Sequence, residues 1–309
     1  MRVEVRHLKK SFGPTMALDD ISFGFGYGDI FGFVGPNGAG KTTTMRIIAS
    51  IDEPTEGDVY INGISVREYP EKIRSSVGFV PDTLPRHTDI TVHEYLDFYA
   101  HAYGLKGTQR QRAVEAVEEF TSLMDIKDKL LDSLSKGMKQ RVSLGRALIH
   151  NPSVLIMDEP AAGLDPRSRV ELRELLKLLR AQNKAILISS HILSELTEIC
   201  NGVVIIEKGR ILESGDIGNI MQKGESIRTI IIRALEDQER LRRELLQMPH
   251  VQAVRNAGKE LHTDISGSEE TSSTMLTALI QRGFRIVEYK QYQNNLEDIF
   301  MKITKGEVQ

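Results

Sequence analysis

The chain has 309 residues, 40% of them hydrophobic and 27% charged, with a formal net charge of −3. This is the composition of a globular protein that is long enough for two domains. The small negative charge gives no electrostatic reason to expect nucleic acid as a partner, and no apolar run approaches the roughly 18 residues of a membrane-spanning helix.

The first 86 residues carry mainly strand and turn signals. Residues 3–8 and 21–27 are predicted strands, and the apolar run 30–34 is predicted to be a buried one. Asn62-Gly63 after a short strand predicts a two-residue hairpin turn. The alternating start, residues 1–6, lacks the apolar core of a secretory signal peptide.

A glycine-rich loop directly after the buried strand is the most informative stretch of the chain. Its residues fit the pattern G-x-x-x-x-G-K-[ST]: Gly35, Pro36, Asn37, Gly38, Ala39, Gly40, Lys41 and Thr42. Gly38 and Gly40 lack the Cβ atoms that would hold the backbone N–H groups away from a triphosphate. Lys41 supplies a positive charge for the β- and γ-phosphates, and the Thr42 hydroxyl is suited to bind Mg²⁺. A helix predicted over 43–51 directs its N-terminus at the same anion.

Residues 88–150 change to helical signals. Thr91 and Glu94 have the spacing of a capping box, and Thr108 and Gln111 repeat that spacing as the start of a second helix. A third helix is predicted to open within 134–141 and to run to residue 150.

Residues 152–213 alternate strands and helices, which predicts an α/β fold with a parallel sheet covered by helices. The apolar strand 154–157 ends in Asp158, where a carboxylate is held beside Mg²⁺, and then in Glu159. On that turn Glu159 is placed to polarise a water molecule aimed at the γ-phosphate. A turn with two acidic caps is the alternative interpretation of these residues.

His191 follows the next predicted strand, residues 185–189. A histidine at the carboxyl end of a parallel strand, near the topological switch point, can reach the γ-phosphate. A purely structural histidine is the alternative.

The segment 134–141 is a second candidate anion site, because the helix that Ser135 caps directs its N–H groups and positive dipole end at its start. A single chain that binds one triphosphate does not need a second anion site. In two copies that face each other head to tail, the second site of each copy can bind the triphosphate of the other. We therefore expect ATP-dependent dimerisation, with Ser135 and Gly137 of each copy covering the other's nucleotide. An N-cap serine without a ligand is the alternative.

The residues beyond a short linker at 222–225 form a second module. Their predicted order over 227–303 is β-α-β-β-α-β, which indicates a ferredoxin-like α+β domain. We expect a nucleotide-binding domain over 1–220, with a helical subdomain at about 88–150, and an accessory domain over 225–309. The single cysteine, Cys200, allows no internal disulfide, so the cytosol is the expected compartment.

The order of these motifs resembles that of the ATP-binding cassette (ABC) ATPases across about residues 1–220. The matching segments are Gly35 to Thr42 for Walker A, Leu134 to Gln140 for the signature motif, Val154 to Asp158 for Walker B, Glu159 for the catalytic base, Ala162 to Asp165 for the D-loop, His191 for the switch histidine, and Phe12 for the aromatic residue that stacks on adenine. The segment from Asn295 to Phe300 resembles the accessory domain of exporter ATPases of the multidrug and antibiotic efflux type.

The resemblance implies a P-loop NTPase with a RecA-like core, an antiparallel β subdomain and a helical subdomain. It implies Mg²⁺-dependent ATP hydrolysis with ATP and Mg²⁺ as cofactors, and it adds Thr43 to the nucleotide contacts. The implied partners are a membrane-spanning permease on a separate chain, docked in the cleft between Asp82 and Tyr99, and a second copy or a related ATPase. The implied location is the inner face of the membrane, and the implied process is export.

Two positions depart from the family pattern. Asp82 stands where the family usually has a glutamine that contacts Mg²⁺ and water, so the metal role of this shorter, charged residue is an open expectation. Lys136 and Met138 replace a glycine and a glutamine of the signature motif, while Ser135 and Gly137 are kept.

Two other function classes compete with a transporter subunit. The first is a cassette ATPase that acts on nucleic acid or the ribosome, but such proteins usually carry two cassettes or a coiled-coil insert. The second is a module that senses nucleotide without hydrolysis, but such proteins often lose the lysine or the base, and Lys41 and Glu159 are both kept.

Overall fold

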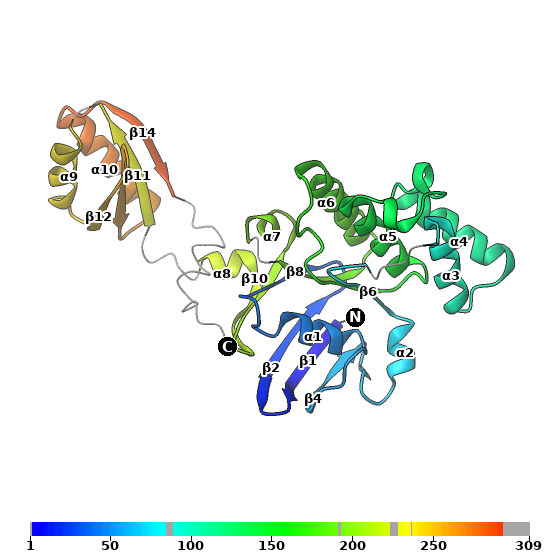
Figure 1. The fold of residues 1–309 in the computed structure, drawn as a ribbon. Helices are drawn as coiled ribbons and strands as arrows, with labels where there is room; N and C mark the ends of the chain where they lie inside the picture. Colours follow the sequence, from blue (N-terminus) through cyan, green and yellow to red (C-terminus); the bar gives the residue numbers. More distant parts are fainter. Residues whose placement is uncertain (1, 85–88, 191–192, 223–227, 236, 293–309) are drawn as a thin grey trace. The chain divides into compact units, whose positions relative to one another are not determined.

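The computed structural model of the chain describes residues 2–84, 89–190, 193–222, 228–235 and 237–292. Their contacts form two compact units, which divide between Ile217 and Gly218 (Figure 1). None of the described helices has both the length and the apolar composition needed to cross a lipid bilayer.

A six-stranded sheet forms the centre of the first unit, in the order β10-β9-β3-β8-β7-β6. The strands are β3 (Ile30–Val34), β6 (Val77–Val80), β7 (Val154–Met157), β8 (Ala185–Ser190), β9 (Gly202–Glu207) and β10 (Arg210–Asp216). All pairs are parallel except β9 with β10. Strands β3, β7, β8 and β9 are buried along their whole length, because elements cover both faces, and this explains their continuous apolar runs.

An antiparallel sheet in the order β2-β1-β4-β5 lies beside this centre. Its strands are β1 (Arg2–Phe12), β2 (Thr15–Gly26), β4 (Glu56–Ile61) and β5 (Ile64–Ser65). Asn62 and Gly63 have φ of 53° and 78°, so the two-residue hairpin turn is confirmed. Helix α1 (Lys41–Ile48) buries Met45 and Ile48 in the core that the two sheets share.

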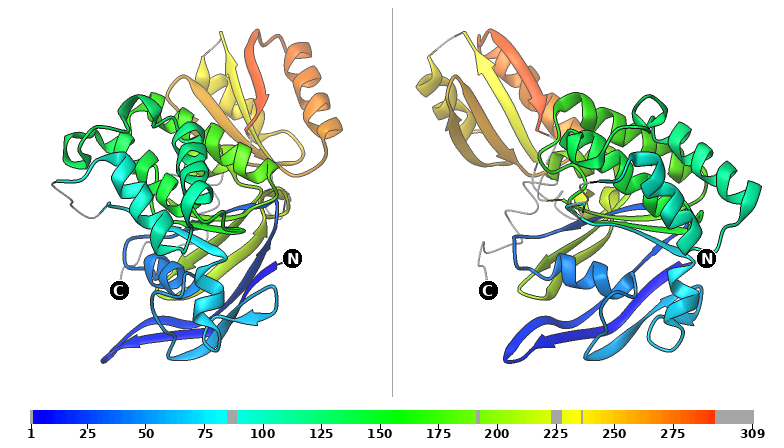
Figure 2. Two further views of the ribbon diagram at one scale, coloured as in Figure 1. Left: turned by 90° about the vertical axis from the view of Figure 1, so that its right-hand side faces the viewer. Right: turned by 45° about the vertical axis from the view of Figure 1, so that its right-hand side comes forward.

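The remaining large helices of this unit are α3 (Val92–Ala102), α4 (Gly107–Phe120), α5 (Lys136–Leu148) and α6 (Pro166–Ala181), with shorter helices α2 (Pro70–Arg74), α7 (Leu193–Ile199) and α8 (Ile217–Gln222). Figures 1 and 2 show α6 and α1 on opposite faces of the central sheet. The capping box of Thr91 and Glu94 is confirmed. The predicted start at Thr108 is wrong, because α4 already begins at Gly107 after an extended Lys106, so Thr108 lies inside the first turn.

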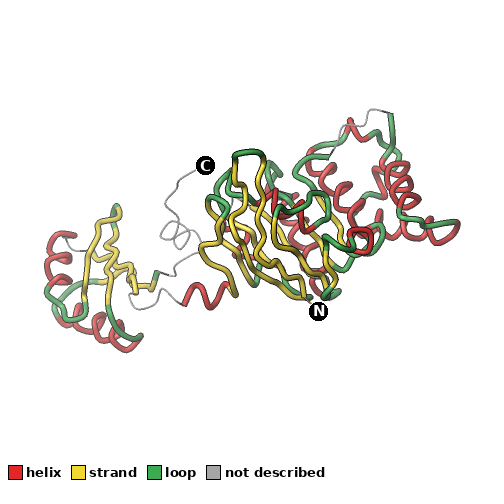
Figure 3. Tube along the Cα trace, turned by 90° about the horizontal axis from the view of Figure 1, so that it is seen from below, coloured by secondary structure: helices red, strands yellow, loops and turns green. Residues whose placement is uncertain are grey.

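The second unit is a four-stranded antiparallel sheet in the order β12-β13-β11-β14, with both helices on one face (Figure 3). Its elements are β11 (Arg228–Ala234), α9 (Gln238–Leu246), β12 (Val251–Ala257), β13 (Glu260–Ile265), α10 (Glu269–Gln281) and β14 (Ile286–Gln291). This is the predicted ferredoxin-like order. The final helix predicted at 296–303 lies outside the described residues.

Candidate nucleotide-binding site

The glycine-rich loop connects the end of β3 to the start of α1. Gly38 and Gly40 have φ of 80° and 106°, conformations that glycine adopts without strain. A Cβ on Gly40 would lie 2.6 Å from Leu18 Cδ2 and 2.9 Å from the Ala17 carbonyl oxygen. At Gly40, therefore, glycine is required by the packing against β2. This requirement adds to the one expected from the sequence, which is that the backbone comes close to a phosphate.

The first turn of α1 offers its backbone N–H groups to the loop. Gly40 is the N-cap residue and has no side chain to accept from them, and the turn contains no acidic residue. The positive end of the helix therefore faces the loop without an internal counter-charge, which favours an anion there.

Lys41 is almost fully buried, with its Nζ 2.6 Å from the Gly35 carbonyl oxygen and 3.2 Å from that of Pro36. The Glu159 carboxylate lies 3.8 Å from the same Nζ. Burial lowers the pKa of Lys41, although the charges of Glu159 and Asp158 act in the opposite direction. A cation held by carbonyl oxygens in this position gains a stronger counter-charge when a phosphate enters.

Thr42, Asp158, Ser189 and Glu159 form one continuous chain of hydrogen bonds. Thr42 Oγ1 donates to Asp158 Oδ2 at 2.7 Å, and Ser189 Oγ donates to Asp158 Oδ1 at 2.7 Å. The backbone N–H of Glu159 donates to Ser189 Oγ at 2.8 Å. Three separate elements, α1, β7 and β8, therefore meet at the Asp158 carboxylate.

Glu159 itself has φ of 48°, in the left-handed region that non-glycine residues rarely adopt. Such backbone strain concentrates at functional sites. Glu159 lines the same pocket as Lys41 and Thr42, which is where a residue that orients water toward a phosphate has to lie.

This pocket brings together most of the residues predicted to bind nucleotide. Its lining consists of Ala17, Pro36, Asn37, Gly38, Gly40, Lys41, Thr42, Thr43, Asp82, Asp158 and Glu159. Ala17 was not predicted, since nothing in its own sequence context marks it. Gly35 and Ala39 belong to the loop but not to the lining.

The oxygen donors of Thr42, Asp158 and Asp82 suit Mg²⁺, which prefers hard oxygen ligands and keeps several waters when it binds with a phosphate. Among the residues that the structure describes, no group of three histidine, cysteine or acidic side chains could hold a metal alone. The donor set therefore fits a cation that shares its coordination with phosphate and water.

Phe12 lies apart from this lining, at the tip of the β1–β2 hairpin, where it pairs with Thr15 and is half exposed. The Lys10 Nζ lies 4.9 Å from the centre of its ring. An exposed aromatic face is free to stack on a base. His191, the predicted γ-phosphate contact, lies outside the described residues.

The signature segment is not part of the pocket of its own chain. Ser135 is the N-cap of α5, and its Oγ accepts from the Met138 N–H at 3.3 Å. A Cβ on Gly137 would lie 2.7 Å from Ser168 Oγ, so α5 packs closely on the start of α6.

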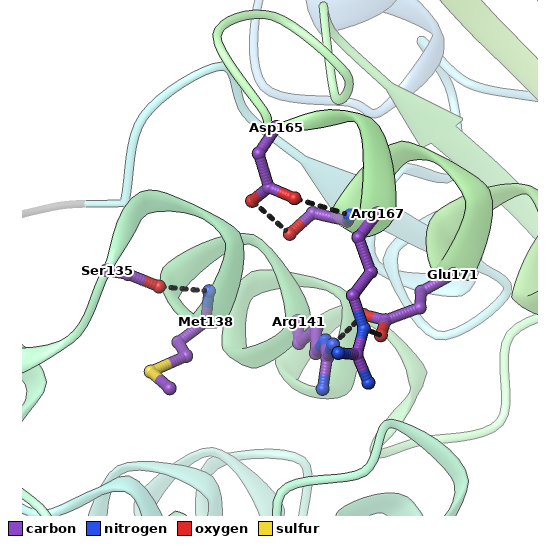
Figure 4. Close-up of polar contacts among 7 residues, drawn as sticks. Ser135, Met138, Arg141, Asp165, Arg167 and Glu171 are labelled. Carbon is purple, nitrogen blue, oxygen red and sulfur yellow. Dashed lines mark hydrogen bonds and ion pairs between the residues drawn. The ribbon is translucent and has the colours of Figure 1, made fainter.

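An ion-pair cluster fixes this packing. Arg141 of α5 and Arg167 of α6 both reach the Glu171 carboxylate (Figure 4). Asp165 caps α6 by accepting from the Ser168 N–H at 3.0 Å. The Arg141–Glu171 pair could not be predicted from sequence motifs, because its members are 30 residues apart.

Comparison with known proteins assigns both units. Residues 18–162 match the family described as ABC transporter, and residues 215–304 match the C-terminal domain described as ATP-binding protein DrrA1-3-like. The second match includes the segment from Asn295 to Phe300, on which the sequence resemblance rested.

Two curated relatives span nearly the whole chain. The chain is 34% identical to Nod factor export ATP-binding protein I of Paraburkholderia xenovorans, covering 99% of this chain and 98% of that one. It is 30% identical to the linearmycin resistance ATP-binding protein of Bacillus subtilis, covering 98% of each.

Solved structures agree with the fold of the first unit. An ATP-binding subunit of an ABC transporter superposes with a TM-score of 0.66 at 31% identity, covering 72% of this chain and 93% of that one. The structure of cbiO1 from Clostridium perfringens, part of the ABC transporter complex cbiONQ, gives a TM-score of 0.63 at 27% identity, covering 72% of this chain and 93% of that one.

Proposed function

From the premise that this chain belongs to the ATP-binding subunits of ABC transporters, we propose that it hydrolyses Mg²⁺-bound ATP to drive export through a separate membrane-spanning permease. The observation that carries this proposal is the convergence of Lys41, Thr42, Asp158 and Glu159 on one pocket, linked by the Thr42–Asp158 hydrogen bond.

The nucleotide phosphates lie on the loop from Gly35 to Thr43, with Lys41 on the β- and γ-phosphates and Phe12 on the adenine ring. Thr42 and Asp158, with Asp82 as a further oxygen donor, would hold Mg²⁺, and the bound ion would neutralise phosphate charge. Glu159 accepts a proton from the attacking water as the general base. His191 holds the γ-phosphate and this water in register.

Hydrolysis requires a second subunit, either another copy or a related ATPase. Ser135 and Gly137 lie on α5, away from the lining of the pocket in their own chain. The first turn of α5 contains no acidic residue, so its N–H groups favour an anion. Because this turn lies away from the chain's own pocket, that anion has to come from another molecule. We assign that anion as the γ-phosphate held by the partner subunit, in a head-to-tail dimer.

Export follows from the relatives, which are named for Nod factor export and for linearmycin resistance. The permease docks between Asp82 and Tyr99, where Phe98 is 60% exposed and packs edge-on against Tyr99. The Arg146 guanidinium over the Tyr99 ring and its bond to the Phe79 carbonyl oxygen connect this surface to β6. Through the permease the subunit lies at the cytoplasmic face of the membrane.

We further assign residues 1–220 to the nucleotide-binding domain, with the helical subdomain at about 88–150, and residues 225–309 to the accessory domain. The division of contacts between Ile217 and Gly218 supports this boundary. The separate core of the second unit, which includes Ile230, Leu261 and Leu279, supports a module that packs independently.

Steady-state ATP hydrolysis by wild type and by Glu159→Gln tests the enzymatic part. The variant keeps the shape of the site but removes the base, so we expect it to bind ATP, dimerise and turn over at least ~100-fold more slowly. Glu71→Gln, at an exposed position of α2, is the matched control and should match wild type. Equal rates for wild type and Glu159→Gln would remove Glu159 from this role.

Purification from membranes tests the transport part. We expect the subunit to co-purify with a multi-span membrane protein and its ATPase rate to change in that complex. Association with DNA or ribosomes, in place of a membrane protein, would favour the cassette ATPases that act on nucleic acid.

A further inference from the structure

We propose that Ser189 is a positioning residue of the ATPase reaction, whose single hydroxyl fixes both the Mg²⁺-side carboxylate of Asp158 and the backbone of Glu159. This inference rests on the proposed function, since it assigns a role within the same site. No sequence motif assigns a role to Ser189, which in the sequence only ends the strand before His191.

The parallel register of β7 and β8 places Ser189 where it can do this. Met157 lies opposite Ile188, so the next residues along the two strands, Asp158 and Ser189, also lie side by side. Ser189 is fully buried, and its Oγ donates to Asp158 Oδ1 while accepting from the Glu159 N–H. Both capacities of the hydroxyl are therefore used within the site.

The first consequence concerns the plane of the Asp158 carboxylate. The terminal torsion of an aspartate is broad, so the side chain alone does not fix it. Ser189 holds Oδ1 and Thr42 holds Oδ2, each at 2.7 Å, and Asp158 is only 5% exposed. Without Ser189, Oδ1 loses its partner and the carboxylate can turn away from the Thr42 side, where a cation would bind.

The second consequence concerns the backbone of Glu159. Its φ of 48° lies in the left-handed region, which is a strained conformation for a residue that carries a side chain. The Ser189 hydroxyl satisfies the N–H of this strained residue at 2.8 Å and so holds the turn in place. Because the backbone direction at Glu159 sets the aim of its side chain, Ser189 also determines where the base points.

Together with the Thr42–Asp158 bond, the two bonds of Ser189 form a series of three hydrogen bonds from Thr42 to Glu159. A displacement of the carboxylate at the cation side is therefore transmitted through one hydroxyl to the backbone of the base. Alanine or valine at position 189 is compatible with a strand but has no hydroxyl group, so it would remove the hydrogen bonds to Asp158 and Glu159.

The strand also has room for a conservative replacement. A cavity of about 260 Å³ lies beside Ser189, with Ala161, Ile188 and Leu196 in its lining. Since β-branched residues suit a strand, threonine is compatible with the backbone at this position. Ser189→Thr therefore keeps the hydroxyl, while Ser189→Ala removes it.

The experiment compares wild type, Ser189→Ala, Ser189→Thr and Ser143→Ala. Ser143 is the matched control: it is a buried serine of α5 whose Oγ has no hydrogen-bond partner in the described structure. The measurements are kcat and KM for ATP, the Mg²⁺ concentration for half-maximal binding of a fluorescent ATP analogue, and the thermal unfolding midpoint.

We expect Ser189→Ala to lower kcat roughly 10- to 100-fold, as loss of a hydrogen bond to a charged group predicts, with KM for ATP within about twofold. The Mg²⁺ requirement for analogue binding should rise several-fold, and binding without Mg²⁺ should be unchanged. Ser189→Thr should restore both kcat and the Mg²⁺ requirement, and Ser143→Ala should match wild type.

A Ser189→Ala protein with wild-type kcat and Mg²⁺ requirement would overturn the inference. So would equal impairment of the alanine and threonine variants, because that result assigns Ser189 to packing. Neither result touches the proposed function, which fails only if wild type itself does not hydrolyse ATP.

Discussion

The Thr42 hydroxyl donates to the Asp158 carboxylate at 2.7 Å, although the two residues are 116 positions apart. This bond connects the first turn of α1 to the end of β7 and brings two oxygen ligands to one point. Each group can also bind Mg²⁺, so the bond marks the place where the cation has to enter beside the phosphates.

Thr42→Val should abolish the hydroxyl while keeping the shape of the side chain. We expect its ATPase rate at saturating Mg²⁺ to fall at least about tenfold, because an oxygen ligand of the cation is lost. Thr42→Ser retains the hydroxyl and should stay within a few-fold of wild type. Steady-state hydrolysis at several Mg²⁺ concentrations measures this, and a valine variant as active as the serine variant would contradict the assignment.

Protonation of His150 should destabilise the first unit below neutral pH. Its ring stacks on Tyr103 at 3.8 Å and its Nε2 lies 3.2 Å from the Val77 carbonyl oxygen. Burial lowers the pKa of His150 to about 4, from the ordinary histidine value of 6.5. The unfolded chain therefore binds a proton that the folded chain does not, and stability is lost as pH falls from 6.5 toward 4.

From these pKa values, His150 should remove about 2 kcal/mol of unfolding free energy between pH 7.5 and pH 5.0. His150→Phe keeps an aromatic ring on Tyr103 and should show a pH dependence smaller by that amount in urea unfolding. His101→Gln, at an exposed position of α3, should keep the wild-type dependence. The same pH dependence in all three proteins would rule out a neutral, buried His150.

Glu171 should contribute more to the free energy of unfolding than Glu174 of the same helix, because it connects α5 to α6. Its carboxylate accepts from Arg141 across the helices and from Arg167 within α6. Glu171→Ala leaves the partly buried guanidinium group of Arg141 and the exposed one of Arg167 without that partner, and it should cost about 1 kcal/mol in urea unfolding. Glu174→Ala removes an exposed pair with Lys177 on the same helix and should cost less than about 0.5 kcal/mol. Equal costs would show that the cross-helix pair adds nothing.

The second unit should unfold without the first when its own core is weakened. Leu279 is fully buried between α10 and the sheet, so Leu279→Ala should destabilise this unit by about 2–5 kcal/mol. Amide hydrogen exchange should accelerate in β11 and β13 and stay unchanged in β3 and β7. Leu246→Ala, at a half-exposed position, is the control. Faster exchange in the strands of both units would show that they unfold as one.

Much of the fold could be predicted because local patterns were strong. The apolar run 154–157 and the β-α-β-β-α-β order after residue 227 needed no tertiary information to be recognised, and both are confirmed. The hairpin at Asn62-Gly63 and the capping box at Thr91 depend on a few adjacent residues. Where local signals competed, as at Thr108, the helix begins two residues earlier than predicted, with Lys106 and not Thr108 as its N-cap.

The residues of the candidate site could be predicted only in part from local sequence patterns. Motif spacing indicated that Lys41, Thr42, Asp158 and Glu159 belong together, and the structure places them around one pocket. Their roles in binding and hydrolysis remain predictions, and His191 lies outside the described residues.

The contacts that hold the site could not be read from the sequence. Ser189 reaches Asp158 because of the β7–β8 register, and Leu18 excludes a side chain at Gly40 because of how β2 crosses the loop. The left-handed backbone at Glu159 could not be predicted, because the residue is not a glycine. These features depend on how distant elements align, which no motif encodes.

Mixing two inactive variants tests the head-to-tail sandwich most directly. Lys41→Ala disables a subunit's own phosphate loop, and Ser135→Glu disables the face that it offers to its partner, so each variant alone should be inactive. A mixed dimer has one site with both changes and one site with neither, so an equal mixture should regain about a quarter of wild-type ATPase activity. Lys41→Ala mixed with Asp158→Asn, two changes on the same side of the site, should regain none. A Lys41→Ala and Ser135→Glu mixture that stays as inactive as its components would contradict the account.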